Sequence, residues 1–200
     1  MARKVKSTLF TMVFTLLIIS MASAGLLALV YKYTRDPILI GVQKKQRLAL
    51  KQVLPEFDNN PIKESITIPS DIEGFNLVVF PAKKDGKLVG IAIKTFTLKG
   101  FSGRFDVIVG FLPDGTIYNS LVLFHQETPG LGDKIEPEKS DFSKQFSGKN
   151  PKNFDLNVEN DGGDVDAITA ATISSRAYCD ALQRAYNAFK SLDLRKFTEN

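Results

Sequence analysis

The chain has 200 residues, of which 44% are hydrophobic and 24% are charged, and this composition excludes both a disordered chain and a polytopic membrane protein. Lys and Arg (26) outnumber Asp and Glu (22), giving a formal net charge of +4. Three of these positive charges are Arg3, Lys4 and Lys6, so the rest of the chain is nearly neutral and does not fit a nucleic-acid-binding surface. With only one histidine and one cysteine, we expect neither a zinc site nor an iron–sulfur cluster in this chain.

An uncharged apolar segment follows the basic start of the chain, from Leu9 to Tyr31. As a helix it would be roughly 35 Å long at about 1.5 Å per residue, enough to cross a hydrocarbon core of about 30 Å. We therefore predict a transmembrane helix at 9–31, with 1–8 in the cytoplasm and the remaining chain outside the (inner) membrane.

A cleaved signal peptide is the alternative interpretation of this segment, because Ala22-Ser23-Ala24 is an A-x-A pattern. The apolar run is longer than the roughly 7–15 residues of a signal peptide's apolar region, and this favours a retained anchor. Both interpretations place the body of the protein on the same, outer side of the membrane.

Residues 32–60 are predicted to link the membrane to the domain, mainly as a helix. Asp36-Pro37 is typical of a helix start, and Pro55 is expected to end the helix. We assign 61–200 to one extracytoplasmic domain, which is long enough to bury a core of its own.

The first half of this domain has the pattern of an antiparallel sheet. Apolar, β-branched runs alternate with Asp-Gly turn signals, as in a meander. Glycines at 99–103 indicate a bend or a close approach to a ligand. A short helix at 140–147 and a long one at 171–192 complete an α+β fold, in which helices pack on an antiparallel sheet. The expected strands are 76–80, 88–98, 105–112 and 116–124.

The loop after the last strand contains the sequence ETPGLG, from Glu127 to Gly132. Its glycines allow close approach of the backbone to a ligand, and the single apolar side chain of Leu131 suits a flat ring. The alternative is an ordinary Pro-Gly turn. His125 and Glu127 are expected to share one face, but we find no catalytic constellation around them.

A second segment of interest is DAITAATISSRA, which runs from Asp166 to Ala177. We predict that Thr169 caps the long helix and that 170–172 forms its first turn, so that free N–H groups could bind a phosphate. Arg176 is expected on the same face as Thr172. The alternative is an ordinary capped helix whose first turn contains small residues.

Together, these segments resemble the flavin-bearing G subunit of the Rnf-type electron-transport complex. The resemblance covers nearly the whole chain and is carried, in the family's order, by GFSGRFDVIVGF, HQETPGLGDKIE and DGGDVDAITAATISSRA. The related C subunit of the sodium-translocating NADH:quinone oxidoreductase is an alternative, but that subunit is usually longer.

The family's flavinylation motif is Asp, two residues, Ser or Thr, Gly, Ala and Thr, with FMN on the final Thr. Asp166, Thr169, Ala171 and Thr172 match it, whereas Ala170 stands in place of Gly. An alanine there is acceptable if its φ is negative, as we expect at a helix start.

The resemblance implies that FMN is bound covalently through a phosphoester to Thr172, attached by a separate flavin transferase that uses FAD and a divalent metal and recognises Asp166. It also implies one-electron transfer in a ferredoxin:NAD oxidoreductase complex coupled to ion translocation. Its partners would be other membrane subunits, including a second flavin-bearing subunit and iron–sulfur subunits. The expected cofactor-binding residues are Glu127, Thr128, Pro129, Gly130, Leu131, Gly132, Thr169, Ala170, Ala171, Thr172, Ile173 and Ser174.

Two other functions stay open from the residues themselves. The same fold could be an anchored, non-redox ligand-binding module, or an extracytoplasmic flavin reductase with a soluble electron acceptor. Covalent flavin in the native protein would argue against the first, and absence of turnover by an anchor-free domain would argue against the second.

Overall fold

A computed structural model of the chain describes residues 8–197. The basic residues Arg3, Lys4 and Lys6, on which the predicted cytoplasmic start depends, lie outside the described residues, as do the last three residues. The chain forms two units, Met1–Lys44 and Lys45–Asn200.

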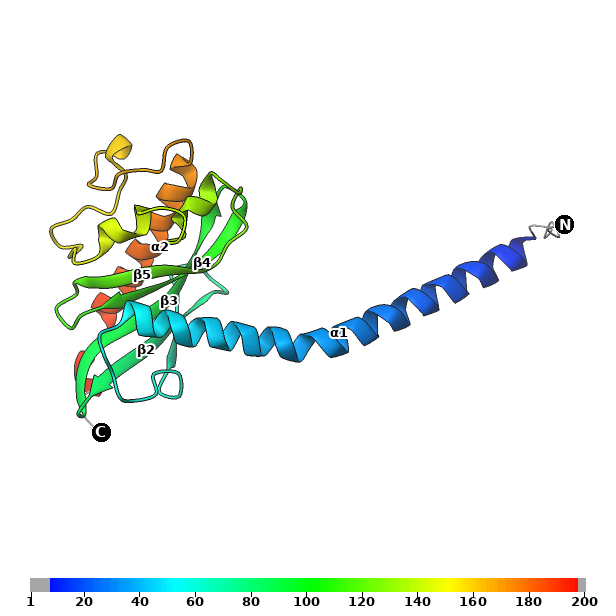
Figure 1. The fold of residues 1–200 in the computed structure, drawn as a ribbon, viewed down its shortest axis with the longest axis horizontal. Coiled ribbons are helices and arrows are strands. Elements are labelled where there is room, and N and C mark those ends of the chain that lie inside the picture. Colours follow the sequence, from blue (N-terminus) through cyan, green and yellow to red (C-terminus); the bar gives the residue numbers. More distant parts are fainter. Residues whose placement is uncertain (1–7, 198–200) are drawn as a thin grey trace. The chain divides into compact units, whose positions relative to one another are not determined.

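A single long helix, α1 (Leu9–Val53), forms most of the first unit and continues into the second (Figure 1). It contains a stretch apolar enough to cross a membrane, none of which is buried. The helix expected to begin at Asp36-Pro37 is instead a continuation of α1, with Pro37 in its interior. Pro37 lacks an N–H, so the helix tolerates one missing hydrogen bond there rather than beginning at it.

The second unit contains a five-stranded antiparallel sheet in the order β1-β2-β3-β4-β5, which confirms the predicted meander. The short first strand was not expected; it has only four residues, ends at Pro69 and lies at the sheet edge. The strands are β1 (Ile66–Pro69), β2 (Asn76–Lys84), β3 (Lys87–Gly100), β4 (Gly103–Phe111) and β5 (Ile117–Phe124).

Both faces of this sheet are covered, since successive residues along a strand point to opposite sides. In β4, Val107 and Val109 belong to one buried cluster, whereas Ile108 between them belongs to the other. The smaller cluster includes Leu50 and Val53 from the end of α1. The larger one lies under the helix α2 (Thr172–Ser191), so the fold is α+β with helices packed on an antiparallel sheet.

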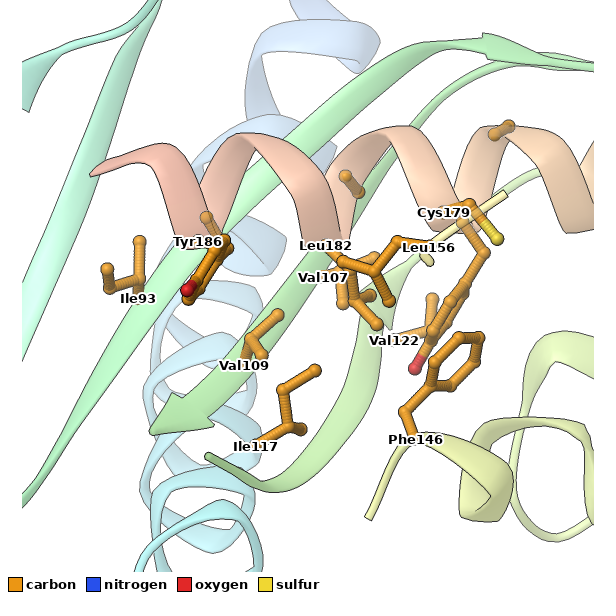
Figure 2. Packing of buried hydrophobic residues seen from close by; sticks show 14 of the residues in the cluster. Ile93, Val107, Val109, Ile117, Val122, Phe146, Leu156, Cys179, Leu182 and Tyr186 are labelled. Carbon is orange, nitrogen blue, oxygen red and sulfur yellow. The ribbon is translucent and has the colours of Figure 1, made fainter. Parts of the chain in front are cut away.

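Figure 2 shows how α2 packs on its face of the sheet. Cys179, Leu182 and Tyr186 project from the helix toward the strands, where they meet residues such as Val107 and Val109 (Figure 2). Single turns of 3₁₀ helix connect β5 to α2. They are η1 (Gly132–Ile135), η2 (Phe142–Phe146) and η3 (Glu159–Asp161), and η4 (Leu194–Phe197) follows α2. Of these, η2 lies within the short helix expected at 140–147.

Polar bonds hold α2 in a fixed position along the sheet. The buried Arg184 donates to the carbonyl of Phe96 in β3 (2.6 Å), and to the carboxylates of Asp71 (2.5 Å) and Asp180 (2.9 Å). The hydroxyl oxygens of Tyr178 and of Ser120 in β5 are hydrogen-bonded to each other at 2.8 Å. These directional bonds fix the helix register, and therefore fix where its first residue, Thr172, emerges.

Candidate functional site

A pocket of about 330 Å³ lies where three loops and the start of α2 meet. Its volume is at the lower end of the range for small-molecule sites, which is about 300–1,000 Å³. Three large apolar side chains of its lining are exposed, namely Phe101, Leu131 and Ile173. The lining residues are Phe101, Glu127, Thr128, Leu131, Gly132, Ala170, Ala171, Thr172, Ile173 and Ser174.

The ETPGLG loop forms one wall of this pocket. The Thr128 carbonyl accepts hydrogen bonds from the amides of Leu131 (3.2 Å) and Asp133 (3.3 Å), which folds the loop into a tight turn. Gly130, at the tip of the turn, has a φ of +77°, a conformation that L side chains rarely adopt. Asp133 anchors the end of the loop to Lys139 at 2.9 Å, and the hydrogen bond from Lys139 lowers the pKa of that carboxyl.

His125 forms hydrogen bonds to both ends of the same loop region. Its Nδ1 accepts a hydrogen bond from the Glu127 amide (3.1 Å), and its Nε2 lies 2.8 Å from Oε1 of Glu136. Since Nδ1 accepts, Nε2 is the ring nitrogen that donates, to Glu136. The expected proximity of His125 and Glu127 is therefore real, but the histidine contacts the backbone of Glu127 rather than its carboxylate.

The segment before α2 forms the opposite wall and is held by side chains from two elements. Gln145 accepts from the Asp166 amide (2.9 Å) and donates to the Asp166 carbonyl (3.1 Å). The Ser175 hydroxyl accepts from the Ile168 amide (2.9 Å) and donates to the Ala171 carbonyl (3.1 Å). These bonds fix the backbone and leave the Asp166 side chain exposed.

Two details of this segment differ from expectation. The helix α2 begins at Thr172, so Thr169 is not its cap; Ala171 precedes the helix and makes no side-chain capping bond. Ala170 has a φ of +63°, not a negative φ. The chain turns sharply at Ala170 before entering the helix, and this turn displaces the helix start by two residues from the predicted one.

The start of α2 nevertheless opens into the pocket. Thr172 is half-buried and lines the pocket together with Ile173 and Ser174. The first N–H groups of an α-helix have no acceptor within the helix, and they favour an anion. The residues present thus fit a ligand with both a flat apolar ring and a phosphate, because apolar rim side chains and a helix N-terminus share one pocket.

Arg176, four residues after Thr172 in α2, does not line the pocket. Its guanidinium forms two hydrogen bonds to Asp161 in η3, at 2.7 and 2.8 Å. This pair, which lowers the pKa of Asp161, ties η3 to the first turns of α2.

Of the residues expected at the site, nine line the pocket. The other four, Pro129, Gly130, Thr169 and Asp166, do not line it; Asp166 and Thr169 lie along a neighbouring groove beside Gln145. Phe101, at the tip of the turn between β3 and β4, lines the pocket but was not expected there. The glycines that flank it in the sequence were the available signal.

Comparisons with known proteins agree with this geometry. Residues 100–187, which include every lining residue of the pocket, match the FMN-binding domain family. The G subunit of the ion-translocating oxidoreductase complex of Erwinia tasmaniensis is 38% identical over 177 residues, covering 85% of this chain and 84% of its own. The G subunits of the same complex from Vibrio vulnificus and Shewanella oneidensis are each 37% identical, over 84–85% of this chain and 83–84% of their own.

Proposed function

The chain belongs to the family formed by the G subunits of ion-translocating oxidoreductase complexes, and from this premise we propose that it carries FMN covalently on Thr172. It is an electron-transfer subunit with an FMN-binding domain and a membrane helix. The proposal concerns how the cofactor is attached, which residues hold it and in which reaction it takes part.

The observation that carries the proposal is the position of Thr172. It is the first residue of α2, it is half-buried and it lines a pocket with an apolar rim. A phosphoester on its hydroxyl oxygen would put a negative charge beside the free N–H groups of the helix start, where anions are favoured. Ala170 supports this assignment as well, since its positive φ explains why the family's motif has Gly at that position.

The remaining lining residues have distinct proposed roles. Phe101, Leu131 and Ile173 would cover the isoalloxazine ring, because they are the large apolar side chains exposed around the pocket. Thr128, Gly132, Ala170, Ala171 and Ser174 would shape its floor, and Pro129 and Gly130 would fix the turn that presents Leu131. When bound, FMN supplies the capacity to accept and release electrons one at a time.

We assign no residue of this chain to the catalysis of FMN attachment. We propose that a flavin transferase supplies it, with the Thr172 oxygen replacing AMP on the FMN phosphorus of FAD. Asp166 is exposed while its backbone is held by Gln145, which suits recognition by another protein. Thr169 lies along the same groove as Asp166 and is assigned to this recognition surface.

In the assembled complex, electrons would pass between ferredoxin and NAD and drive ion translocation. Residues 9–31 would span the membrane, 32–60 would link to the domain, and 61–200 would lie on the extracytoplasmic side. The expected neighbours are the other membrane subunits, among them a second flavin-bearing subunit and iron–sulfur subunits.

Denaturing electrophoresis of the native protein, read by flavin fluorescence, tests the attachment. Wild type and Thr67→Ala, which removes a hydroxyl from an exposed residue outside the pocket, should give a fluorescent band, whereas Thr172→Ala should not. Fluorescence retained by Thr172→Ala would refute the assignment. A wild-type protein without flavin, purified from cells that contain the transferase, would favour the non-redox binding module.

A further inference from the structure

Glu127 presents a buried carboxylate to the pocket. The residue is only 4% exposed, and it lines the cavity together with Thr172 and Ser174. Its Oε1 accepts a hydrogen bond from the Ser102 amide (3.0 Å), and its Oε2 accepts one from the Ser174 hydroxyl. Both partners donate, which is the arrangement that stabilises an ionised carboxylate.

Two glycines, one at the end of β3 and one at the end of the ETPGLG loop, border this carboxylate. A Cβ on Gly132 would lie 2.6 Å from Oε2 of Glu127, and a Cβ on Gly100 would lie 2.7 Å from Oε1. Neither glycine has a positive φ, so backbone conformation does not require glycine at these positions. At Gly132 the closest atoms belong to the side chains of Glu127 and Ser174, so the carboxylate accounts for the glycine there. At Gly100 the carbonyl oxygen of Gly103 would lie closer still, 2.3 Å from the Cβ, so the strand turn and the carboxylate both exclude a side chain.

No cation neutralises Glu127 within residues 8–197, where the ion pairs include none to its carboxylate. Its neighbour Asp133, by contrast, is paired with Lys139. Of the atoms of Glu127, His125 contacts only the amide, through a ring nitrogen that accepts. An unpaired carboxylate is rarely buried without a role, because removing a charge from water is unfavourable.

We propose that Glu127 is a fixed negative charge that lowers the midpoint potential of FMN in this pocket. The inference rests on the proposed function, since it requires FMN at the pocket. Adding an electron from a redox partner of the complex adds negative charge beside Glu127, and like charges repel most strongly where water is excluded. Glu127 itself gains and loses no electron or proton, and forms no bond to the cofactor.

The test is a spectroelectrochemical titration of the FMN-loaded full chain. Glu127→Gln removes the charge but keeps an oxygen to accept from Ser102 and an amide to donate to Ser174. Its midpoint potential should rise by on the order of 59 mV, a tenfold change in the one-electron equilibrium constant. The matched control is Glu138→Gln, which removes the same charge from an exposed residue outside the pocket and should leave the potential unchanged.

A second variant, Gly132→Ala, displaces the carboxylate without changing the net charge. The atoms nearest to its new Cβ are side-chain atoms of Glu127 and Ser174, so the displacement is feasible. It should also raise the potential, by less than Glu127→Gln does. An unchanged or lower potential in Glu127→Gln overturns the proposal.

If Glu127→Gln does not retain FMN, the test rests on the midpoint potential of Gly132→Ala. A potential equal to that of the wild type then overturns the proposal. Failure of both variants to load FMN also overturns it, because the carboxylate would then be needed for binding. A wild-type protein without flavin on Thr172 would instead refute the proposed function, and this result is distinct from the outcomes above.

Discussion

Ala170 is in the left-handed region, with a φ of +63°, two residues before the start of α2. For a residue with a Cβ, this conformation costs roughly 1–2 kcal/mol relative to the right-handed one. Glycine has no such penalty, but it loses about 0.5–1 kcal/mol more conformational entropy on folding. Ala170 is exposed, so removal of its methyl group eliminates few van der Waals contacts.

Ala170→Gly should therefore stabilise the domain, by about 0.5–1 kcal/mol. For a domain of this size, 1 kcal/mol corresponds to about 2–4 °C in Tm, so we expect an increase of about 1–4 °C. Thermal unfolding followed by circular dichroism, and urea unfolding at 25 °C, would both measure the change.

Ala188→Gly provides a matched control, because Ala188 is half-exposed in the interior of α2. There the same substitution should lower the stability by about 1 kcal/mol, since glycine is a poor helix former. Opposite signs for the two variants would support the reasoning. A loss of stability in Ala170→Gly similar to that in Ala188→Gly would show that Ala170 is not strained.

Two further predictions concern the loop and the helix. Gln145→Ala removes both side-chain hydrogen bonds to the Asp166 backbone and should slow FMN attachment to Thr172. Mass spectrometry of samples taken over time in the presence of the transferase measures the rate. An unchanged rate would exclude a role for these two hydrogen bonds in attachment. Asp180 is partly buried, which raises its pKa, but hydrogen bonds from Lys99, Arg184 and Thr97 outweigh burial and lower it. Its stabilising contribution is thus complete above about pH 4 and is lost as the pH falls through the lowered pKa. Asp180→Asn should be less stable than wild type at pH 7 in urea, with a smaller difference at pH 3; an equal difference at both would contradict this.

The meander and the long second helix could be predicted because local signals determine them. Asp-Gly turns separate β-branched runs in β2–β5, and small and apolar residues recur along α2 every three or four positions. The short strand β1 could not be predicted in the same way, because it exists only through its pairing with β2.

The site was less predictable, since its geometry depends on tertiary contacts. Sequence spacing suggested that Thr169 caps the helix, but the helix begins at Thr172, where the Ser175 bonds to Ile168 and Ala171 hold the preceding backbone. Phe101 meets Leu131 and Ile173 at the pocket only because the β3–β4 turn folds back to the ETPGLG loop. The space for the Glu127 carboxylate likewise appears only when Gly100 and Gly132 come together.

Peptide mapping of the native protein tests the central claim most directly. Trypsin should release 153–176 as one peptide, which contains Thr169, Thr172, Ser174 and Ser175 as competing hydroxyl residues. We predict that this peptide carries the mass of FMN less one water, and that fragmentation places the addition on Thr172. An unmodified peptide from FMN-containing protein, or an addition on any of the other three residues, would contradict the account.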